Sequence, residues 1–411
     1  MLAFTLPDHG AATPEIGADW AAHPSWELVD AASDAAGRDV AALLLAPRED
    51  EALIEHAHLA TFVLSLVAVD AAERLGLAPM AVSGYGLGEY TALVSAGALS
   101  FEDGVRLVLE RGIAMREELI DTPCATVEIH GLDDDDVEAA CARAEGDAWV
   151  AGYDAPGQVV VSGTTEGVQR AASVARSLGA TRVVPLASRD GIHTPLLSRA
   201  RDRLRKSLAA ATFAEADPVV VSNVDARHHA DPAEWPGLLS AQLCAPVRWR
   251  RSVDALFAEG VRTFVEFGAG ATLAASTRRC FPSKAVQAYT ISSPADLEAL
   301  VDRLIATPSL RRRAVADHDQ LAGRLIVSPA AGPFQPVDDV VHAAPRLAGI
   351  PVAHEGPAGA FRVDVGDLIG WVGDAEVRSA FAGTLGGLLV IAGERVMPSQ
   401  PVAWLDARSE T

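Results

Sequence analysis

The sequence has 411 residues, of which 49% are hydrophobic and 22% are charged, and this length suits two or three globular domains. The formal net charge of −21 argues against a nucleic-acid or anionic-membrane surface, because such surfaces need clustered lysine and arginine. The four cysteines form no C-x-x-C pair, which argues against a metal knuckle and a disulfide framework. The dispersed cysteines fit a reducing cytoplasm, so we expect a cytoplasmic protein. We expect no membrane span, since neither a signal-peptide pattern nor a long uninterrupted apolar run is present.

Strand and helix patterns alternate over residues 1–121 and again over residues 188–295. Such alternation is typical of an α/β fold, in which helices cover a mostly parallel sheet. In the first segment the patterns predict strands at 4–6 and 80–83 and helices at 26–36, 57–75 and 100–118; in the second they predict strands at 219–223 and 263–267 and a helix at 249–258.

Residues 122–187 follow a different order, βαββαβ, which is the ferredoxin-like arrangement. We therefore expect a small subdomain inserted into the larger one. The four aspartates at 133–136 are interpreted as the solvated start of a helix, because a calcium loop would need spaced ligands and a glycine. The predicted strands are 125–130, 149–153, 158–162 and 181–186, and the predicted helices are 133–144 and 165–178.

The C-terminal part divides into a charged helical connector over residues 296–323 and a region of short strands over 324–411. The latter is rich in glycine, proline, valine and alanine, with turn residues between the strand patterns, so we expect a small all-β module. Its predicted strands are 325–327, 360–363, 368–372, 377–378, 388–391 and 402–405.

The stretch VSGYGLGE at residues 82–89 has the frame of a nucleophile elbow, G-x-S-x-G, in which a sharp strand-to-helix turn exposes a serine. Here Gly86 stands at the position of the serine, so no covalent intermediate can form on that residue. No neighbouring residue in the sequence is an obvious substitute, and the phenol of Tyr85 is a poor nucleophile near its reference pKa of about 10. Glycine also relieves the backbone strain that an elbow imposes on other residues.

Taken in order, the motifs resemble the malonyl-CoA:acyl-carrier-protein transacylase family over residues 1 to about 295. The resemblance implies an acyltransferase fold, an α/β-hydrolase-like parallel-sheet domain with an inserted ferredoxin-like subdomain. The segments that carry it are Pro7-Asp8-His9-Gly10 for Pro-Gly-Gln-Gly, Gly84 to Glu89 for Gly-His-Ser-Leu-Gly-Glu, Arg111-Gly112-Ile113-Ala114-Met115 for Arg-Gly-x-x-Met, Asp154-Ala155-Pro156-Gly157-Gln158 for Asn-x-Pro-x-Gln, Ile192-His193-Thr194-Pro195-Leu196 for Phe-His-Ser-Pro-Leu, Ser222-Asn223, and Gln242 to Trp249 for Gln-Leu-x-x-Pro-Val-x-Trp.

The resemblance also implies a role for each matching residue. In the family, serine takes malonyl from CoA and passes it to a carrier-protein thiol, with histidine as the base and backbone amides binding the oxyanion. By this resemblance His193 is the base and Arg111 pairs with the malonyl carboxylate. The amides of His9 and Leu87 would form the oxyanion hole, and three further residues are assigned to substrate binding: His58, Asn223 and Gln242.

The departures from the family pattern gather in the site. Gly86 replaces serine and Tyr85 replaces the histidine beside it, while His9 and His58 stand where glutamine is usual. Retention of Arg111 means either that an anionic group still binds or that an internal carboxylate now pairs with the guanidinium. We expect no metal, because no acidic ligand accompanies the histidines in sequence.

The C-terminal module resembles biotinyl/lipoyl carrier domains of the barrel-sandwich type, through residues 377–384 and 393–401. That family attaches its prosthetic group to a lysine. The only lysines of this sequence are Lys206 and Lys284, so covalent biotin or lipoate is excluded in the module. It can still serve as a docking or dimer surface, which leaves a homo-oligomer open.

Three hypotheses for function follow. The favoured one is a non-catalytic protein of polyketide or fatty-acid-type biosynthesis that binds an acyl carrier protein, an acyl-CoA or phosphopantetheine thioester, or another synthase subunit. The second is a thioester hydrolase or direct acyl transferase that uses His193 as base. The third is a scaffold acting through the β module.

Overall fold

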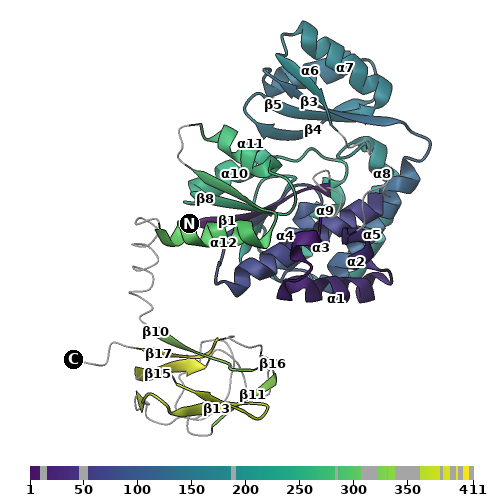
Figure 1. Cartoon of the computed structure of the whole chain (residues 1–411). Helices are drawn as coiled ribbons and strands as arrows, with labels where there is room; N and C mark the ends of the chain where they lie inside the picture. Colours follow the sequence, from purple (N-terminus) through teal and green to yellow (C-terminus); the bar gives the residue numbers. More distant parts are fainter. Residues whose placement is uncertain are drawn as a thin grey trace. The chain divides into compact units, whose positions relative to one another are not determined.

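The structure is a computed structural model that describes residues 1–9, 16–45, 54–186, 191–282, 286–306, 323–330, 332–337, 362–379, 383–388, 395–396 and 401–406. The chain divides into two compact units, Met1–Leu300 and Val301–Thr411. The first unit contains the α/β elements of Figure 1, and the second contains the short strands β10 to β17.

A five-stranded sheet in the order β7-β2-β1-β8-β9 organises the first unit. Every paired neighbour is parallel, which confirms the parallel α/β prediction. The strand β9 was not predicted. The strands are β1 (Leu2–Leu6), β2 (Ala81–Gly84), β7 (Val219–Val221), β8 (Thr263–Phe267) and β9 (Gln287–Ile291).

Helices surround this sheet (Figure 1), and α3 is the central one, packing on α1, α2, α4 and α5. By length and composition α3 could cross a membrane, but 83% of its most apolar window is buried inside the unit, as in the core helix of a globular domain. The helices are α1 (Glu27–Ala36), α2 (Val40–Leu45), α3 (Ile54–Arg74), α4 (Gly88–Ser95), α5 (Phe101–Glu118), α8 (Ser198–Ala210), α9 (Trp235–Gln242), α10 (Trp249–Ala258), α11 (Thr272–Cys280) and α12 (Pro294–Ala306).

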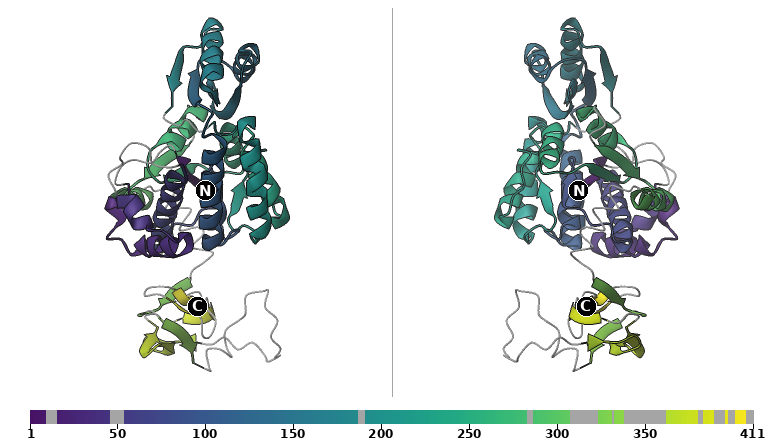
Figure 2. Two further views of the ribbon diagram at one scale, coloured as in Figure 1. Left: turned by 90° about the vertical axis from the view of Figure 1, so that its right-hand side faces the viewer. Right: turned by 90° about the vertical axis from the view of Figure 1, so that its left-hand side faces the viewer.

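A second, antiparallel sheet in the order β4-β5-β3-β6 forms the small subdomain. This is the strand order of a ferredoxin-like βαββαβ unit, and α6 and α7 lie together on the side away from the large sheet (Figure 2). Asp133 caps α6 by accepting from the amide of Asp136 at 2.9 Å, so the aspartate run does begin a helix. The elements are β3 (Cys124–His130), α6 (Asp134–Arg143), β4 (Ala148–Ala155), β5 (Gln158–Thr164), α7 (Thr165–Ser177) and β6 (Arg182–Pro185).

The second unit contains two four-stranded sheets, β10-β17-β15-β12 and β14-β13-β11-β16, around a core that includes Phe334, Ile369 and Val402. The predicted connector is helical up to Ala306, and residues 307–322 lie outside the described residues, as does most of the carrier-like segment 393–401. The strands are β10 (Gly323–Val327), β11 (Gly332–Pro336), β12 (Arg362–Val363), β13 (Leu368–Val372), β14 (Ala375–Arg378), β15 (Gly383–Leu388), β16 (Arg395–Val396) and β17 (Pro401–Asp406).

Candidate active site

The turn from β2 to α4 forms the elbow predicted from the sequence. A β-carbon on Gly84 would lie 1.9 Å from the carbonyl of Gly88, and one on Gly88 would lie 2.0 Å from the carbonyl oxygen of Leu6. Between them Gly86 has a φ of +54°, in the left-handed region that favours glycine. Close backbone approach therefore requires the two outer glycines, whereas both the conformation and the surroundings of position 86 favour glycine there.

Asp8 fills the space above Gly86. A β-carbon at position 86 would lie 2.8 Å from Oδ2 and 2.9 Å from Cγ of Asp8, closer than real contacts allow. The aspartate stands where the family pattern quoted above has glycine, directly after β1. The carboxylate of a residue that follows β1 therefore occupies the place that the side chain of a serine at position 86 would take, and the expectation that no neighbouring residue is a substitute nucleophile stays a prediction.

The carboxylate of Asp8 also engages the two amides that the resemblance assigns to an oxyanion hole. Oδ1 accepts from the backbone amides of His9 at 3.0 Å and Leu87 at 3.1 Å, and from Nδ1 of His9 at 2.9 Å. Burial acts to raise the pKa of Asp8, but the charge and hydrogen bond of His9, with the charges of Arg111 and His193, hold it well below its usual value. The group is thus a stable anion bound in the hole.

A buried network beneath the elbow fixes its backbone. The amide of Gly86 donates to Oδ1 of Asn223 at 2.7 Å, and its carbonyl accepts from Nε2 of Gln242 at 2.6 Å. Glu89 joins both partners, since it accepts from the amide of Asn223 at 2.8 Å and from Gln242 Nε2 at 2.6 Å. Burial raises the pKa of Glu89 to about 7. Asn223 and Gln242 therefore position the elbow, and neither lines the cavity described below.

His193 is buried and lies in an uncommon backbone conformation, with a φ of +58°. Its Nδ1 lies 2.7 Å from the carbonyl oxygen of Gln242, which assigns the ring proton to Nδ1 and the basic lone pair to Nε2. Thr194 supports the turn by donating to the carbonyl of Gly191 at 2.5 Å. This is the orientation that a general base requires.

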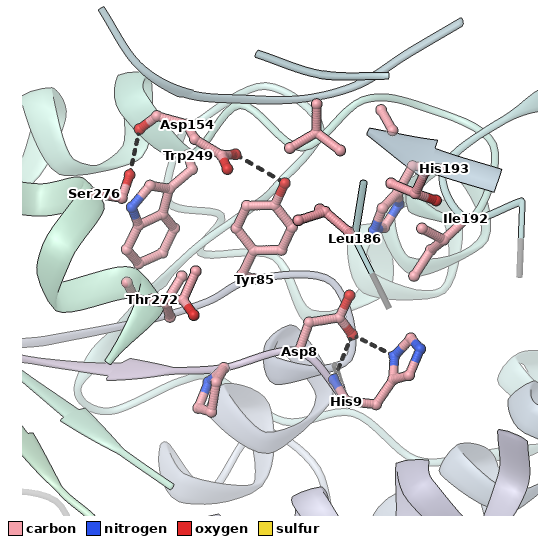
Figure 3. A pocket seen from close by; sticks show the side chains of 15 residues that line it. Asp8, His9, Tyr85, Asp154, Leu186, Ile192, His193, Trp249, Thr272 and Ser276 are labelled. Atoms are coloured by element: carbon pink, nitrogen blue, oxygen red, sulfur yellow. Dashed lines mark hydrogen bonds and ion pairs between the residues drawn. The ribbon is translucent and has the colours of Figure 1, made fainter. Parts of the chain in front are cut away.

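Tyr85 links the elbow to the small subdomain, because its hydroxyl donates to Oδ1 of Asp154 at 2.9 Å (Figure 3). Burial raises the pKa of Asp154 to about 7. Burial, followed by the charge of Asp154, raises the pKa of Tyr85 well above its usual value, so this phenol is no nucleophile. Gly152 makes room for the ring, since a β-carbon there would lie 2.0 Å from the tyrosine hydroxyl. Sequence reasoning missed this pairing, although Asp154 stands where the family pattern has asparagine.

Arg111 is fully buried on α5, and its Nη1 lies 3.2 Å from Nε2 of His58. Its Nε and Nη2 atoms are buried without a hydrogen-bond partner among the described residues, and no carboxylate there forms an ion pair with it. Burial, then the charges of His9 and Arg111, lower the pKa of His58 well below its usual value, so this imidazole is neutral. The described residues contain no group of three histidine, cysteine or acidic side chains able to hold a metal.

A cavity of about 210 Å³ opens between the elbow and the small sheet. In Figure 3 the side chains of Asp8 and Tyr85 reach it from the large subdomain, with His193 and Ile192 on one side and Trp249 on another. Its other lining residues are Pro7, His9, Thr126, Ala151, Asp154, Val160, Leu186, Thr272, Leu273 and Ser276.

The model of the acyl transferase domain family matches residues 18–306. The malonyl-CoA-acyl carrier protein transacylase of Escherichia coli (strain K12) is 34% identical over 310 residues, which cover 74% of this chain and 99% of that protein. The chain belongs to the malonyl-CoA:acyl-carrier-protein transacylase family.

Solved members of this family share the fold. The crystal structure of an acyl-carrier-protein S-malonyltransferase from Burkholderia pseudomallei has a TM-score of 0.70 at 34% identity, covering 73% of this chain and 99% of that one. A type II polyketide-synthase acyl-carrier protein in complex with its malonyl-transacylase gives a TM-score of 0.70 at 30% identity, with coverage of 74% and 99%. The first unit of this chain thus has the acyltransferase fold, with Gly86 and Asp8 at the centre of its candidate site.

Proposed function

We propose that this acyltransferase-family protein binds an acyl carrier protein or its acyl thioester without forming an acyl-enzyme. The observation that carries the proposal is the carboxylate of Asp8, which fills the serine position above Gly86 and accepts both amides of the hole. The likeness to malonyl transacylases, one of them solved with its acyl-carrier protein, supports the choice of ligand and partner.

The occupied hole weighs against thioester chemistry at this site. Loss of a single oxyanion donor lowers kcat by roughly 10²–10³ in a well-studied protease. Here the amides of His9 and Leu87 both donate hydrogen bonds to the carboxylate of Asp8. An incoming carbonyl would have to displace that anion before either amide could stabilise its developing charge.

Asp8 is itself a poor replacement nucleophile. A carboxylate whose pKa is held far below its usual value is a weak base, and Oδ1 already accepts three hydrogen bonds. Attack on a thioester would give a mixed anhydride while the oxyanion hole remained filled by the attacking group. Such an adduct would be detectable by mass, so the experiment below includes this outcome.

Hydrolysis with His193 as base is the second candidate, because the Nδ1 contact with Gln242 leaves Nε2 in the basic form. The same cavity lining contains Asp8, whose charge faces any polarised carbonyl near His193. The geometry therefore favours binding over turnover.

The C-terminal unit is assigned a docking role, with an acyl carrier protein, a synthase subunit or a second copy of the chain as its partner. No lysine follows Lys284, so a biotinyl- or lipoyl-like module here would act through its surface alone. A cytoplasmic location remains a prediction that suits a carrier-protein partner.

The test uses the full chain with malonyl-CoA and hexanoyl-CoA, followed by intact-mass measurement and a thiol-release assay. A serine-containing family member serves as the positive control. We expect no acyl adduct, no thiol release above buffer, and saturable binding of immobilised holo-acyl carrier protein. An adduct on any side chain overturns the proposal, and thiol release that disappears in His193→Ala establishes the hydrolase instead.

A further inference from the structure

The cavity beside Asp8 is lined mainly by carbon. Its walls come from both subdomains and include Val160, Leu186, Ile192, Trp249 and Leu273. Its volume of about 210 Å³ exceeds the roughly 150 Å³ at which an apolar protein cavity binds benzene. The space is therefore large enough for a short apolar group.

Among the described residues that line this cavity, Asp8 and Asp154 carry carboxyl groups, His9 and His193 carry imidazoles, and none is an arginine or a lysine. Asp8 is held as an anion by its three hydrogen bonds, and Asp154 is engaged by the hydroxyl of Tyr85. A second carboxylate brought beside Asp8 would meet like charge, and like charges that share a buried site disfavour ionisation of one of them.

Arg111, the family's partner for a malonyl carboxylate, does not line the cavity. His9 lines it, the ring of His9 packs edge-on to that of His58 with centroids 4.3 Å apart, and His58 in turn contacts Arg111. Two imidazole rings thus lie between the cavity and the guanidinium. A carboxylate placed in the cavity would face the anion of Asp8 and would be separated from the guanidinium of Arg111 by these rings.

We propose that this cavity binds an uncharged, apolar acyl group and discriminates against a carboxylated one such as malonyl. The proposal rests on the binding function proposed above and specifies its ligand. Each methylene that enters the cavity contributes about fourfold to affinity. Hexanoyl-CoA should therefore bind at least tenfold more tightly than malonyl-CoA, since the CoA portion is common to both.

The test measures equilibrium binding of acetyl-, butyryl-, hexanoyl- and malonyl-CoA to the full chain by calorimetry. We expect affinity to rise from acetyl-CoA to hexanoyl-CoA, with malonyl-CoA the weakest ligand. Asp8→Asn removes the charge and should narrow the hexanoyl-to-malonyl ratio by about tenfold, whereas the exposed control Asp135→Asn should leave the ratio unchanged.

A cavity-filling variant, Ala151→Leu, should weaken hexanoyl-CoA at least tenfold and leave acetyl-CoA nearly unchanged. If it does not fold, Val160→Phe is the substitute on the neighbouring strand. Binding of malonyl-CoA as tight as that of hexanoyl-CoA or tighter, no dependence of affinity on acyl length, or no binding of hexanoyl-CoA overturns the proposal. An acyl adduct in the same samples would instead overturn the non-acylating function, so the two failures are distinguishable.

Discussion

The residues beneath Gly86 keep the family pattern, whereas the residues above it depart from that pattern. Beneath Gly86, the residues Glu89, Asn223 and Gln242 form a closed set of buried hydrogen bonds. Above it the residues depart from the pattern in matched pairs. Asp8 fills the space that Gly86 leaves, and Tyr85 donates to Asp154 across the two subdomains.

We interpret this difference as a site rebuilt around Asp8 and Asp154. Buried polar atoms without partners cost about 1–3 kcal/mol each. Both acids have partners, two amides and an imidazole for Asp8 and a phenol for Asp154. Nε and Nη2 of Arg111, which the family pattern retains, have none among the described residues. We therefore expect stability to depend on the residues beneath Gly86 and, under the proposal above, ligand choice to depend on those above it.

We expect the largest effect on stability from a substitution that breaks the hydrogen bonds of Glu89 beneath Gly86. Glu89→Ala leaves the amide of Asn223 and Nε2 of Gln242 without their carboxylate acceptor, and we expect the free energy of unfolding to fall by about 4 kcal/mol. Chemical denaturation of the wild type and the variants measures this free energy of unfolding. Glu89→Gln keeps an acceptor and should lose less, while the exposed Glu166→Ala should change stability by less than about 0.5 kcal/mol. Equal losses for Ala and Gln would show that Glu89 does not unite this network through its oxygens.

We expect the free energy of unfolding to depend on pH through the carboxyl group of Asp154, which lies above Gly86. Its folded pKa is about 7, above the ordinary value of 3.8, so folding favours the protonated carboxyl and stability is lost as the pH rises. Between pH 5 and pH 8 this loss amounts to about 2–3 kcal/mol. Asp154→Asn cannot ionise, so its unfolding free energy should fall less over that range than that of the wild type.

The comparison between the two proteins isolates Asp154, because burial also raises the pKa values of Glu89 and Glu266 to about 7 and these groups titrate with the same sign. Both glutamates are present in the wild type and in Asp154→Asn, so their contributions to the pH dependence cancel when the two proteins are compared. Parallel curves of stability against pH for wild type and Asp154→Asn would contradict this assignment.

We expect the smallest loss of stability from a substitution at Gly152, which packs against the hydroxyl of Tyr85. Gly152→Ala places a carbon 2.0 Å from the tyrosine hydroxyl and should cost about 1–3 kcal/mol through displacement of the ring. In a Tyr85→Phe background the clashing oxygen is gone, and the same substitution should cost about 1 kcal/mol less. A double-mutant cycle with no coupling between the two positions would rule out this contact.

Local patterns were enough to predict most of the first unit. The helices predicted to start at residues 100 and 133 begin there as α5 and α6, where Ser100 accepts from the amide of Asp103 at 3.1 Å and Asp133 from that of Asp136 at 2.9 Å. The strand β8 has the predicted bounds, Thr263–Phe267, because five buried residues in a row fit a central parallel strand. The edge strand β9 was missed, since its residues are mostly half-buried and carry no continuous apolar run.

The sequence identified individual residues of the candidate site but not which of them contact one another. The motifs identified Gly86, Tyr85 and His193, and the substitution of Asp8 for glycine was visible in the same turn. What the sequence could not supply was the distance between residues 8 and 86, which only the pairing of β1 with β2 brings together. The same holds for residues 85 and 154, which belong to different subdomains. The signal that would have found both pairs is that each change in the elbow, Gly86 or Tyr85, is accompanied by a new acid elsewhere in the motifs, Asp8 or Asp154.

The most direct test of the account restores both family residues at once and measures acylation by malonyl-CoA with intact-mass spectrometry. Gly86→Ser alone should stay unmodified, because its β-carbon meets the carboxylate of Asp8 and the hole remains filled. Asp8→Gly alone lacks a nucleophile and should also stay unmodified. The account predicts a stable malonyl adduct on the serine of the double variant Asp8→Gly/Gly86→Ser; equal acylation of Gly86→Ser alone, or none in the double variant, would contradict it.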